Sequence, residues 1–530
     1  MEWQLAASDL GAVGRWLAEH GSIDGLVIEP RPTLQILDTY LDTDDWRIHR
    51  AGFALRIRSQ SGKSEATLKS LQSARSEVAD RRELSEELDS PRSESIQQLM
   101  GPVGTRVHAV TGARALRPLF EVHTSRQRFS IHGEEEGRQL GEIALDDTVI
   151  SRPHGESQAS LQRVEVEALT ETHEPLRSLV KTLRDDLALE AAPDSKYSQG
   201  LRSTGLVPEL APQFAPTGVE DSMSMAEAAR ANLRRYLTAW YLHEPGARLG
   251  DDPEELHDLR VAGRRLDAVL RQFRSSLPPS FLRIRPTLKK VLRSLGEVRD
   301  LDVALGELDA FRRELPESDQ PSIEPLTRHW AAERGRARER MLTVLDSASV
   351  HRSLQKLESL LAAPLAIAQQ TSTARVLDLA PQIIRLRYRK LRKNAQLLTP
   401  DSPIEAYHEV RGRVKKLRYA LESVAVIYGK PADEMLRALH RWQEKLGVQQ
   451  DAAVAGRRLK ALAGAPPEDI PPETLFLMGR LAERYASAGA QAKRRYAKGY
   501  RRVRARWKRL RMKLEALAVN ETPDIADPGP

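Results

Sequence analysis

Two segments of the chain repeat basic residues at helical spacing, in a pattern able to hold an anion. They read HDLRVAGRRLDAVLRQF from His257 and HEVRGRVKKLRYALESV from His408. Arginine binds phosphate oxygens bidentately, lysine adds a point charge, and a histidine ring adds donors whose charge rises as the pH falls toward about 6. These residue types therefore favour binding of an anion with several oxygens.

Each segment separates into two faces on a helix of about 100° per residue. Like charges one turn apart destabilise an isolated helix by about 0.2–0.5 kcal/mol per pair, so a bound anion would compensate them. The apolar faces are Leu259, Ala262, Leu266, Val269, Leu270 and Phe273, and Val410, Val414, Leu417, Leu421 and Val424. The cationic faces are His257, Arg260, Arg264 and Arg271, and His408, Arg411, Lys415 and Arg418.

The two segments belong to a longer repeat. His257 and His408 are 408 − 257 = 151 residues apart. LGEVRDLDVA at Leu295 and LGVQQDAAVA at Leu446 have the same offset, 446 − 295 = 151. Two motif pairs in one register indicate a duplicated helical unit, with two pseudo-symmetric bundles. If the copies face each other, their cationic faces line one basic groove or pore, suited to a flexible inorganic polyanion.

The segments LKKVLRSL and RLRYRKLRKN supply cations that can extend this groove. Taken singly, each such cation is also compatible with a solvated or ion-paired charge. His257 and His408 are likewise compatible with structural contacts, and we expect Asp300 and Asp451 to cap helices or pair with arginine. The additional cations are Lys289, Lys290, Arg293, Arg385, Arg387, Arg389, Lys390, Arg392 and Lys393.

Charge is distributed unevenly along the chain. Residues 1–205 hold 25 Lys and Arg against 33 Asp and Glu, a net charge of −8. The remainder holds 82 − 25 = 57 against 74 − 33 = 41, a net charge of +16. A polyanionic partner fits this second part, although a solvated basic surface explains the charge alone equally well. Nucleic acid is the less favoured polyanion, because only 5% of residues are aromatic and no nucleic-acid-binding signature is present.

Composition excludes several classes of protein. With 530 residues, the chain is long enough for two or three domains. We expect no transmembrane helix and no secretory signal, since no run of about 18 apolar residues and no basic start followed by an apolar stretch is present. The absence of cysteine excludes disulfides, thiolate metal sites and a cysteine nucleophile. These features are compatible with a cytoplasmic protein that is not membrane-bound.

The predicted organisation is an α+β chain of more than one domain. Residues 1–202 are mostly extended, because several segments alternate in character with a period of two, and one helix follows from Pro175. Residues 203–222 are a Pro- and Gly-rich linker. Residues 223–513 are helical, with copies at about 223–373 and 374–513, and residues 514–530 are disordered. The extended segments are ALRIRS, EATLKSL, FEVHTSRQRFSI, LGEIALDD and LQRVEVEAL.

The helical part resembles the CHAD family over roughly residues 223–513, on both copies of both motifs. The resemblance implies an α-helical domain that binds inorganic polyphosphate on a central basic surface without catalysis and without a cofactor. It also implies a location at polyphosphate granules. Carried over by position, the binding residues are His257, Arg260, Arg264, Arg265, His408, Arg411, Lys415, Lys416 and Arg418.

The first part resembles the CYTH family of triphosphate tunnel proteins. The resemblance implies an antiparallel β-barrel with a charged lumen, in which cations hold triphosphate or tripolyphosphate and carboxylates hold Mg²⁺ or Mn²⁺. The alternation of side chains along the strands agrees with this fold. Arg56 and Arg58 share one strand face, and Glu165 and Glu167 share another. The segments that carry the resemblance are DTYLDT, AGFALRIRS, TLKSL, TSRQRF, GEIALDD, VEVEAL and DSKY.

The resemblance assigns three roles to residues of this tunnel. The phosphate-binding residues are Arg56, Arg58, Lys69, Arg126, Arg128 and Lys196. The metal ligands are Glu2, Glu142, Asp146, Glu165 and Glu167. If the tunnel is active, the catalytic residues are Glu2, Lys69, Glu165 and Glu167.

The opening strand departs from the family pattern Glu-x-Glu-x-Lys. The corresponding positions hold Glu2, Gln4 and Ala6. A neutral amide competes poorly for a hard divalent cation, and loss of a lysine removes stabilisation of developing negative charge. We therefore expect a formed tunnel with weak or absent hydrolysis that still binds phosphate.

Three hypotheses follow for the whole chain. The first is a polyphosphate-binding protein with a degenerate tunnel, and the second is a metal-dependent inorganic triphosphatase anchored to polyphosphate by its CHAD part. The third is a basic helical scaffold for nucleic acid or protein. Phosphate release from tripolyphosphate separates the first two, and relative affinity for polyphosphate and DNA at fixed salt separates the third.

Overall fold

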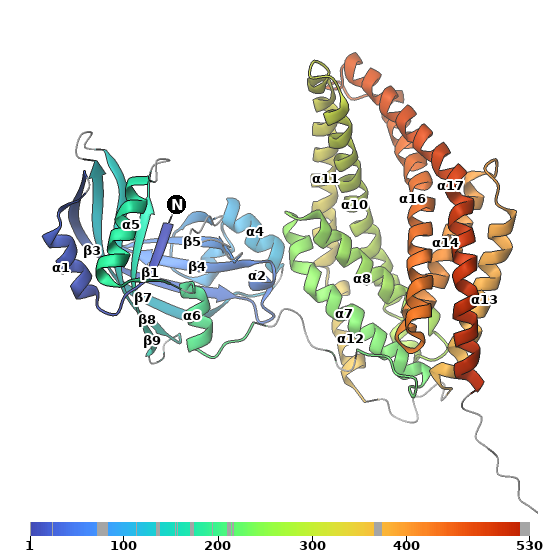
Figure 1. The fold of residues 1–530 in the computed structure, drawn as a ribbon, viewed down its shortest axis with the longest axis horizontal. Coiled ribbons are helices and arrows are strands. Elements are labelled where there is room, and N and C mark those ends of the chain that lie inside the picture. The colour runs from blue at the N-terminus through green and yellow to red at the C-terminus, as the bar shows by residue number, and fades with distance from the viewer. Residues whose placement is uncertain are drawn as a thin grey trace, which may run out of the picture. The chain divides into compact units, whose positions relative to one another are not determined.

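The structure of the chain is a computed structural model (Figure 1). It divides into two compact units, residues 1–212 with 244–252 and residues 213–243 with 253–530. Among the described residues, none of the helices is both long enough and apolar enough to span a membrane. The described residues are 2–23, 25–71, 83–112, 114–133, 138–153, 155, 157–169, 174–192, 194–208, 214, 217–364 and 374–519.

The first unit contains one antiparallel sheet, which we call the sheet domain. Ten strands of the described chain form it, in the order β10-β1-β9-β8-β7-β3-β4-β5-β6, with β2 paired to β3. This arrangement confirms the predicted antiparallel fold. The strands are β1 (Glu2–Ala6), β2 (Ser22–Ile23), β3 (Leu26–Asp42), β4 (Phe53–Gln60), β5 (Lys63–Ser70), β6 (Glu83–Leu88), β7 (Arg117–Gly133), β8 (Gln139–Ser151), β9 (Ser157–Ala168) and β10 (Glu190–Ala191).

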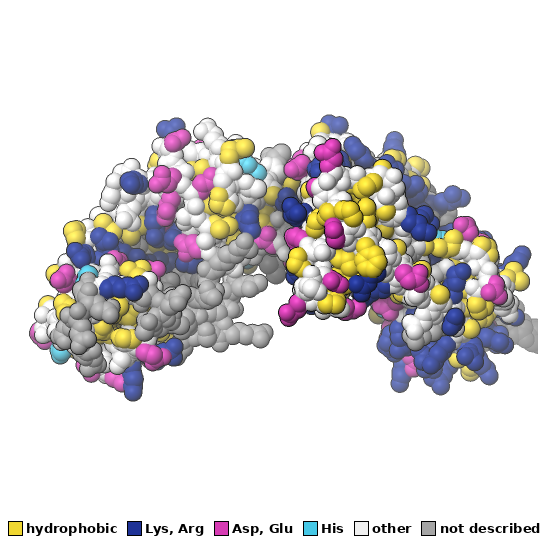
Figure 2. Space-filling view, turned by 90° about the horizontal axis from the view of Figure 1, so that it is seen from above, with side chains coloured by type: hydrophobic (Ala, Val, Ile, Leu, Met, Phe, Trp, Pro, Cys, Tyr) yellow, Lys and Arg dark blue, Asp and Glu magenta, His cyan; other side chains and the backbone are white. Residues whose placement is uncertain are grey.

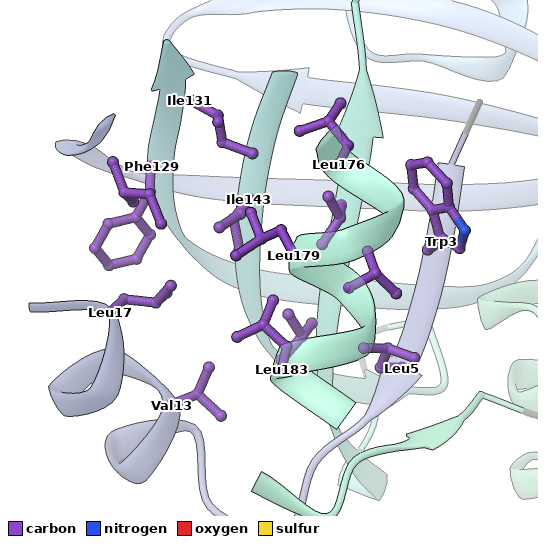
Figure 3. Packing of buried hydrophobic residues seen from close by; sticks show 14 of the residues in the cluster. Trp3, Leu5, Val13, Leu17, Phe129, Ile131, Ile143, Leu176, Leu179 and Leu183 are labelled. Carbon is purple, nitrogen blue, oxygen red and sulfur yellow. The ribbon is translucent and has the colours of Figure 1, made fainter. Parts of the chain in front are cut away.

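Two amphipathic helices cover one face of this sheet. Figure 3 shows Leu176, Leu179 and Leu183 of α5 (Glu174–Leu187) packing against β1, β7 and β8, with α1 (Leu10–Glu19) beside them. Helix α5 is the helix predicted from Pro175. Because strand side chains alternate, the residues between these core positions point to the opposite face. The shorter helices are α2 (Arg47–Arg50), α3 (Ser93–Ile96), α4 (Pro102–Thr111) and α6 (Lys196–Ser203).

The second unit is helical, as predicted, and we call it the helical domain. Figure 1 shows two long hairpins, α10 with α11 and α16 with α17. Its helices are α7 (Met225–Leu249), α8 (Pro253–Gln272), α9 (Pro279–Leu282), α10 (Arg285–Glu314), η1 (Gln320–Ile323), α11 (Glu324–Leu345), α12 (Ala348–Ala362), α13 (Val376–Leu397), α14 (Ile404–Glu422), α15 (Ala425–Tyr428), α16 (Lys430–Gly464) and α17 (Pro472–Val519).

The predicted disordered tail begins too early. Helix α17 continues through residue 514 and ends at Val519. The basic, amphipathic pattern that starts at Gln491 therefore extends 519 − 513 = 6 residues past the predicted boundary. The rest of the predicted tail, residues 520–530, lies outside the described residues.

The apolar faces predicted for the two basic helices are buried. Leu259, Leu266 and Leu270 of α8 are at most 1% exposed, and Val414 and Leu417 of α14 are fully buried. The opposite face of each helix is only half-buried. The hydrophobic effect therefore orients both helices so that the cationic faces remain accessible.

The two copies are related by a pseudo-two-fold rotation. Ser224 forms an antiparallel bridge with Arg375. Arg375 is the residue of the second copy that corresponds to Ser224, because 375 − 224 = 151. The Gln272 side-chain amide donates to Ser423 Oγ at 3.0 Å, and 423 − 272 = 151 as well. Equivalent residues pair with each other only across a two-fold axis, as in an isologous dimer. The sequence repeat is thus a structural one.

Candidate functional site

The basic faces of α8 and α14 meet in the helical domain, where the two helices pack together. Arg260 and Arg264 of α8 lie near Arg411 and Lys415 of α14, and we call these four residues the central cluster. Burial, followed by the charges of Arg264, Arg411 and Arg260, lowers the pKa of Lys415 to about 7. Arg260 and Arg264 of one predicted cationic face therefore lie within electrostatic reach of Lys415 of the other.

The central cluster obeys the pseudo-two-fold symmetry. Arg411 is the equivalent of Arg260, and Lys415 is the equivalent of Arg264, since 411 − 260 and 415 − 264 are both 151. Burial and then Arg264 lower the pKa of Arg260. Its Nε atom is buried and, among the described residues, has no hydrogen-bond partner. A buried donor of this kind can be satisfied by a ligand oxygen.

The second repeated motif supplies a flat support for each arginine. A Cβ at Gly296 of α10 would lie 3.3 Å from Arg260 Nη2, and a Cβ at Gly447 of α16 would lie 3.2 Å from Arg411 Nη2. Glycine thus lets each guanidinium lie against a helix backbone. Asp451 Oδ1 is 4.0 Å from Arg411 Nη1, which agrees with its predicted role as an arginine partner.

The histidines that open the two motifs lie half-buried on α8 and α14. Burial, followed by the charge of Arg299, lowers the pKa of His257. His257 also lies within the electrostatic influence of Arg260, so it borders the central cluster. Its ring is therefore mainly neutral at neutral pH and offers one donor rather than a charge.

Two of the predicted binding residues pair with a carboxylate, and a third lies among other cations. Arg418 donates to Glu422 at 3.0 Å, and Arg265 lies 3.5 Å from the same carboxylate. Lys416 is exposed, and its pKa is lowered by burial and then by Arg413 and Arg271. Lys416 therefore belongs to a second group of cations on another side of α14, because residues 415 and 416 are about 100° apart on the helix.

The remaining predicted cations lie on α10 and α13. Arg385 is half-buried and 4.0 Å from Glu515. Figure 2 shows Lys and Arg side chains gathered at the edge of the domain that carries α13 and α17. A continuous path from there to the central cluster stays a prediction. The exposed residues are Lys289, Lys290, Arg293, Arg389, Arg392 and Lys393.

The sheet domain contains a charged cavity of about 280 Å³. It opens on the face of β9 that carries Glu165 and Glu167, opposite the core residues Val164 and Val166. Arg128 does not line the cavity, and it lies 3.6 Å from Glu142. The predicted tunnel residues that line the cavity are Arg56, Arg58, Lys69, Arg126, Glu165, Glu167 and Lys196.

Two buried aspartates organise the cations of this cavity. Arg58 donates to both carboxylate oxygens of Asp38 at 2.8 Å, and Arg126 donates to both oxygens of Asp146 at 2.7 Å. Asp38 is 1% exposed and Asp146 is fully buried. Burial alone would raise the pKa of Asp38, but Arg56 and Arg58 hold it below its usual range.

Glu165 completes this network. Arg126 Nη2 donates to it at 2.5 Å, and Lys196 Nζ lies 3.3 Å away. Lys196 also donates to Asp146. Against the effect of burial, Lys196 and Arg126 lower the pKa of Glu165 to about 2. The cavity therefore holds its cations in fixed positions by pairing them with carboxylates.

Five further charged, amide or phenol side chains line the cavity and were not among the predicted site residues. The period-two alternation that assigned Glu165 and Glu167 to the lumen also includes Arg163, so that pattern was sufficient to find it. Glu83, which pairs with Lys69 at 3.0 Å, lies outside the recognised motifs. The five residues are Gln4, Tyr40, Glu83, Arg163 and Tyr197.

Comparison with known protein families identifies two domains in the chain. A CYTH domain model matches residues 17–198, and a CHAD domain model matches residues 231–460. The chain carries a CYTH domain followed by a CHAD domain. No curated protein matches the sequence.

Solved structures similar to this chain come from plants and bacteria. The CHAD domain from the plant Ricinus communis is 25% identical, with 58% of this chain and 97% of that chain covered and a TM-score of 0.45. PptA from Streptomyces chartreusis is 21% identical, with 53% and 100% covered and a TM-score of 0.41. HpAC1 from Hippeastrum, described as having a dominant triphosphatase activity, is 20% identical, with 39% and 97% covered and a TM-score of 0.30.

Several carboxylates predicted as metal ligands in the CYTH domain lie beside protein cations. Asp146 and Glu165 are paired with Arg126 and Lys196, and Glu142 is paired with Arg128. In the described part of the chain, no three acidic or histidine side chains are grouped closely enough to hold a metal. Three of the five predicted metal ligands, Glu142, Asp146 and Glu165, therefore have protein cations as partners. The side chain of Glu2 lies outside the described residues.

The first strand of the CYTH domain, β1, pairs antiparallel with β9. Backbone pairing places Glu2 opposite Glu167 and Gln4 opposite Glu165. Ala6 stands opposite Arg163. The two altered positions of the motif, Gln4 and Ala6, thus adjoin the wall of the cavity that Arg163 lines.

Proposed function

We propose that this protein binds inorganic polyphosphate through the central cluster of its CHAD domain. The observation that supports this proposal is the meeting of four cations, two from each repeat, in which Arg260, Arg264 and Arg411 surround Lys415. Such a group is electrostatically unfavourable by itself, and a bound polyanion would neutralise it. Several phosphate oxygens within one chain can satisfy Arg260, Arg264 and Arg411 together.

Symmetry favours polyphosphate over a nucleic acid strand. A linear inorganic polyphosphate reads the same in both directions, whereas a nucleic acid strand has a 5′ and a 3′ end. The pseudo-two-fold cluster presents Arg260 and Arg411 as equivalents, so it suits a ligand without direction. The nearest aromatic rings also have cation partners already, since Arg265 lies 5.6 Å from the ring of Tyr236 and Arg418 lies 4.9 Å from that of Tyr419.

The CYTH domain is proposed to bind short phosphate chains in its cavity with weak or absent hydrolysis. Paired cations in fixed positions support binding, and the loss of charge at Gln4 and Ala6 disfavours turnover. The alternative is a triphosphatase in which Mg²⁺ or Mn²⁺ supports hydrolysis. Phosphate release from tripolyphosphate with either ion is expected to stay at background. Turnover that Glu165→Gln abolishes would instead establish the enzyme.

The proposal for the CHAD domain is tested by reversing the central cluster. The variant Arg260→Glu, Arg264→Glu, Arg411→Glu, Lys415→Glu is expected to lose at least about 100-fold in affinity for long-chain polyphosphate, since charge-assisted contacts contribute roughly 1.5–3 kcal/mol each. Calorimetry at fixed salt measures this change. The proposal fails if affinity is unchanged, or if the native protein binds single-stranded DNA equally well at equal phosphate concentration.

A matched control carries four reversals at exposed cations of the same domain that lie away from the cluster. It is expected to bind polyphosphate within about threefold of the native protein, because general surface charge contributes less than direct contacts. An equal loss of polyphosphate affinity in this control would show that the cluster contributes only nonspecific charge. The control positions are Arg352, Lys356, Lys430 and Lys460.

The proposed partner also defines a proposed location, the cytoplasm at polyphosphate granules. A fluorescent fusion is expected to coincide with stained granules and to become diffuse when the central cluster is reversed. A diffuse native fusion in granule-containing cells would contradict this location.

A further inference from the structure

Arg163 is a buried cation on the cavity wall of the CYTH domain. It lies on β9, is 3% exposed and lines the cavity. Its Nη2 atom donates to the backbone carbonyl of Asp194 at 2.6 Å, and its Nη1 atom donates to Gln4 Oε1 at 3.5 Å. Both acceptors are neutral.

The other cations of the cavity differ from Arg163 in their partners. Each of them lies within ion-pair distance of a carboxylate: Asp38, Glu83, Asp146 or Glu165. Among the described residues, Arg163 has no carboxylate at that distance. Burial lowers the pKa of Arg163, with Glu165 and Asp146 opposing this effect from further away. These other cations are Arg56, Arg58, Lys69, Arg126 and Lys196.

An incompletely neutralised guanidinium beside a polar cavity favours an anion there. Removing a charge from water costs several kcal/mol unless a partner compensates it, and neutral acceptors compensate only in part. An anion in the cavity would complete this compensation. The guanidinium has five donors, and the two bonds to Gln4 and Asp194 use only part of that capacity.

We propose that Arg163 binds a phosphoryl group of a short linear phosphate chain in the cavity, without a bridging metal ion at Gln4. The inference rests on the proposed binding function of the CYTH domain and assigns it a residue that the sequence motifs do not include. Arg163 stands opposite Ala6 in the strand register, so it supplies a cation where the first strand has none. Because the amide of Gln4 carries no charge, it does not neutralise the guanidinium of Arg163, and an anionic ligand can do so instead.

A purely structural role is the competing explanation, because Arg163 also ties β9 to the segment before α6. Arg152 provides a matched control. Its Nη2 atom donates to the backbone carbonyl of Thr204 at 3.0 Å, but it does not line the cavity. Loss of either arginine removes a bond to a backbone carbonyl, and only loss of Arg163 removes a charge from the cavity.

The experiment uses the full chain with the central cluster reversed, so that the CHAD domain does not contribute. Calorimetry with sodium tripolyphosphate, in EDTA and in Mg²⁺, is expected to show binding in both. Arg163→Met is expected to weaken it at least about tenfold, Arg163→Lys less, and Arg152→Met not at all. Adding Ala6→Lys to Arg163→Met is expected to restore at least half of the lost binding free energy.

Several results would overturn the inference. They are undiminished binding by Arg163→Met, an equal loss in Arg152→Met, absence of binding in EDTA, and failure of the parent to bind tripolyphosphate. If Arg163→Met does not fold, as judged by thermal unfolding, the Arg163→Lys variant tests the inference instead. Tripolyphosphate binding by Arg163→Lys that equals binding by the parent would contradict a bidentate contact. Failure of the CHAD proposal has a separate signature, which is long-chain polyphosphate binding that survives reversal of the central cluster.

Discussion

The CYTH and CHAD domains both gather cations, but they neutralise them in different ways. In the CYTH cavity, buried carboxylates hold the cations, as Asp146 holds Arg126 and Lys196. In the CHAD cluster, cations face other cations, and the pKa of Lys415 is lowered to about 7 as a result of burial and of these neighbours. The cavity cations other than Arg163 each have a carboxylate partner, whereas in the central cluster only Arg411 has one at ion-pair distance among the described residues, Asp451.

This difference separates stability from binding. A paired cation contributes to folding through its carboxylate, so removal of that carboxylate should damage the fold. A cation among cations contributes mainly when a ligand is present, so its removal should damage binding instead. Three predictions examine this contrast.

The largest expected effect is on the stability of the CYTH domain. Asp146→Asn removes the fully buried carboxylate that Arg126 and Lys196 share and leaves them only Glu165, so it is expected to reduce the free energy of unfolding by about 3–5 kcal/mol. Chemical denaturation measures this change. The control Asp147→Asn alters the neighbouring, exposed carboxylate and is expected to change stability by less than about 0.5 kcal/mol. Equal effects of the two variants would remove the distinction between the domains.

An intermediate effect is expected on the pH dependence of polyphosphate binding. Lys415 is charged below its pKa of about 7 and loses this charge as the pH rises, so affinity is expected to fall between pH 6 and pH 8. The bound anion favours the charged form and raises the pKa, so binding at pH 8 takes up a proton. One such group changes affinity by up to about tenfold per pH unit. Calorimetry in buffers of different ionisation enthalpy detects the proton uptake.

The variant Lys415→Arg tests whether this pH dependence belongs to Lys415. Arginine remains charged throughout this pH range, so the variant is expected to bind with little change between pH 6 and pH 8. A pH dependence that persists in this variant would assign the titration to another group.

The smallest expected effect concerns the glycine support of the CHAD cluster. Gly447→Ala places a Cβ 3.2 Å from Arg411 and should displace its guanidinium by a few tenths of an ångström, which weakens polyphosphate binding about two- to fivefold. Gly456→Ala lies on the same helix, α16, with open space around the new Cβ, and should leave affinity unchanged. Identical affinities of the two variants would show that the glycine only permits packing.

Local periodicity predicted much of this molecule. A period of 3.6 separated the buried face of α8 from its cationic face, and a period of two identified the strands that line the cavity. The shared offset of 151 predicted the duplication, which the bridge between Ser224 and Arg375 displays directly. These features depend on residues close together in sequence, or on repetition, which a sequence shows without structure.

Partner choice between distant residues was not predictable in the same way. Glu422 pairs with Arg418 on its own helix and with Arg265 on α8, and nothing in the spacing of these residues signals the second contact. The neutralisation of Asp146 likewise depends on Lys196, which is 50 residues away. The sequence indicated seven of the charged residues that line the cavity, but not Glu83 or Arg163, and not that the charges would pair with one another.

The two-fold relation between the repeats also gives the CHAD domain two sides that differ. The equivalents of Arg265 and Glu422 are Lys416 and Arg271, because 416 − 265 and 422 − 271 are both 151. An attractive ion pair on one side of the axis therefore corresponds to a repulsive pair of cations on the other. Each side nevertheless holds two cations and one carboxylate, because Arg418 joins Arg265 and Glu422, while Asp267, the equivalent of Arg418, pairs with Arg271. The two copies have thus exchanged the positions of their charges while keeping the same net charge on both sides of the axis.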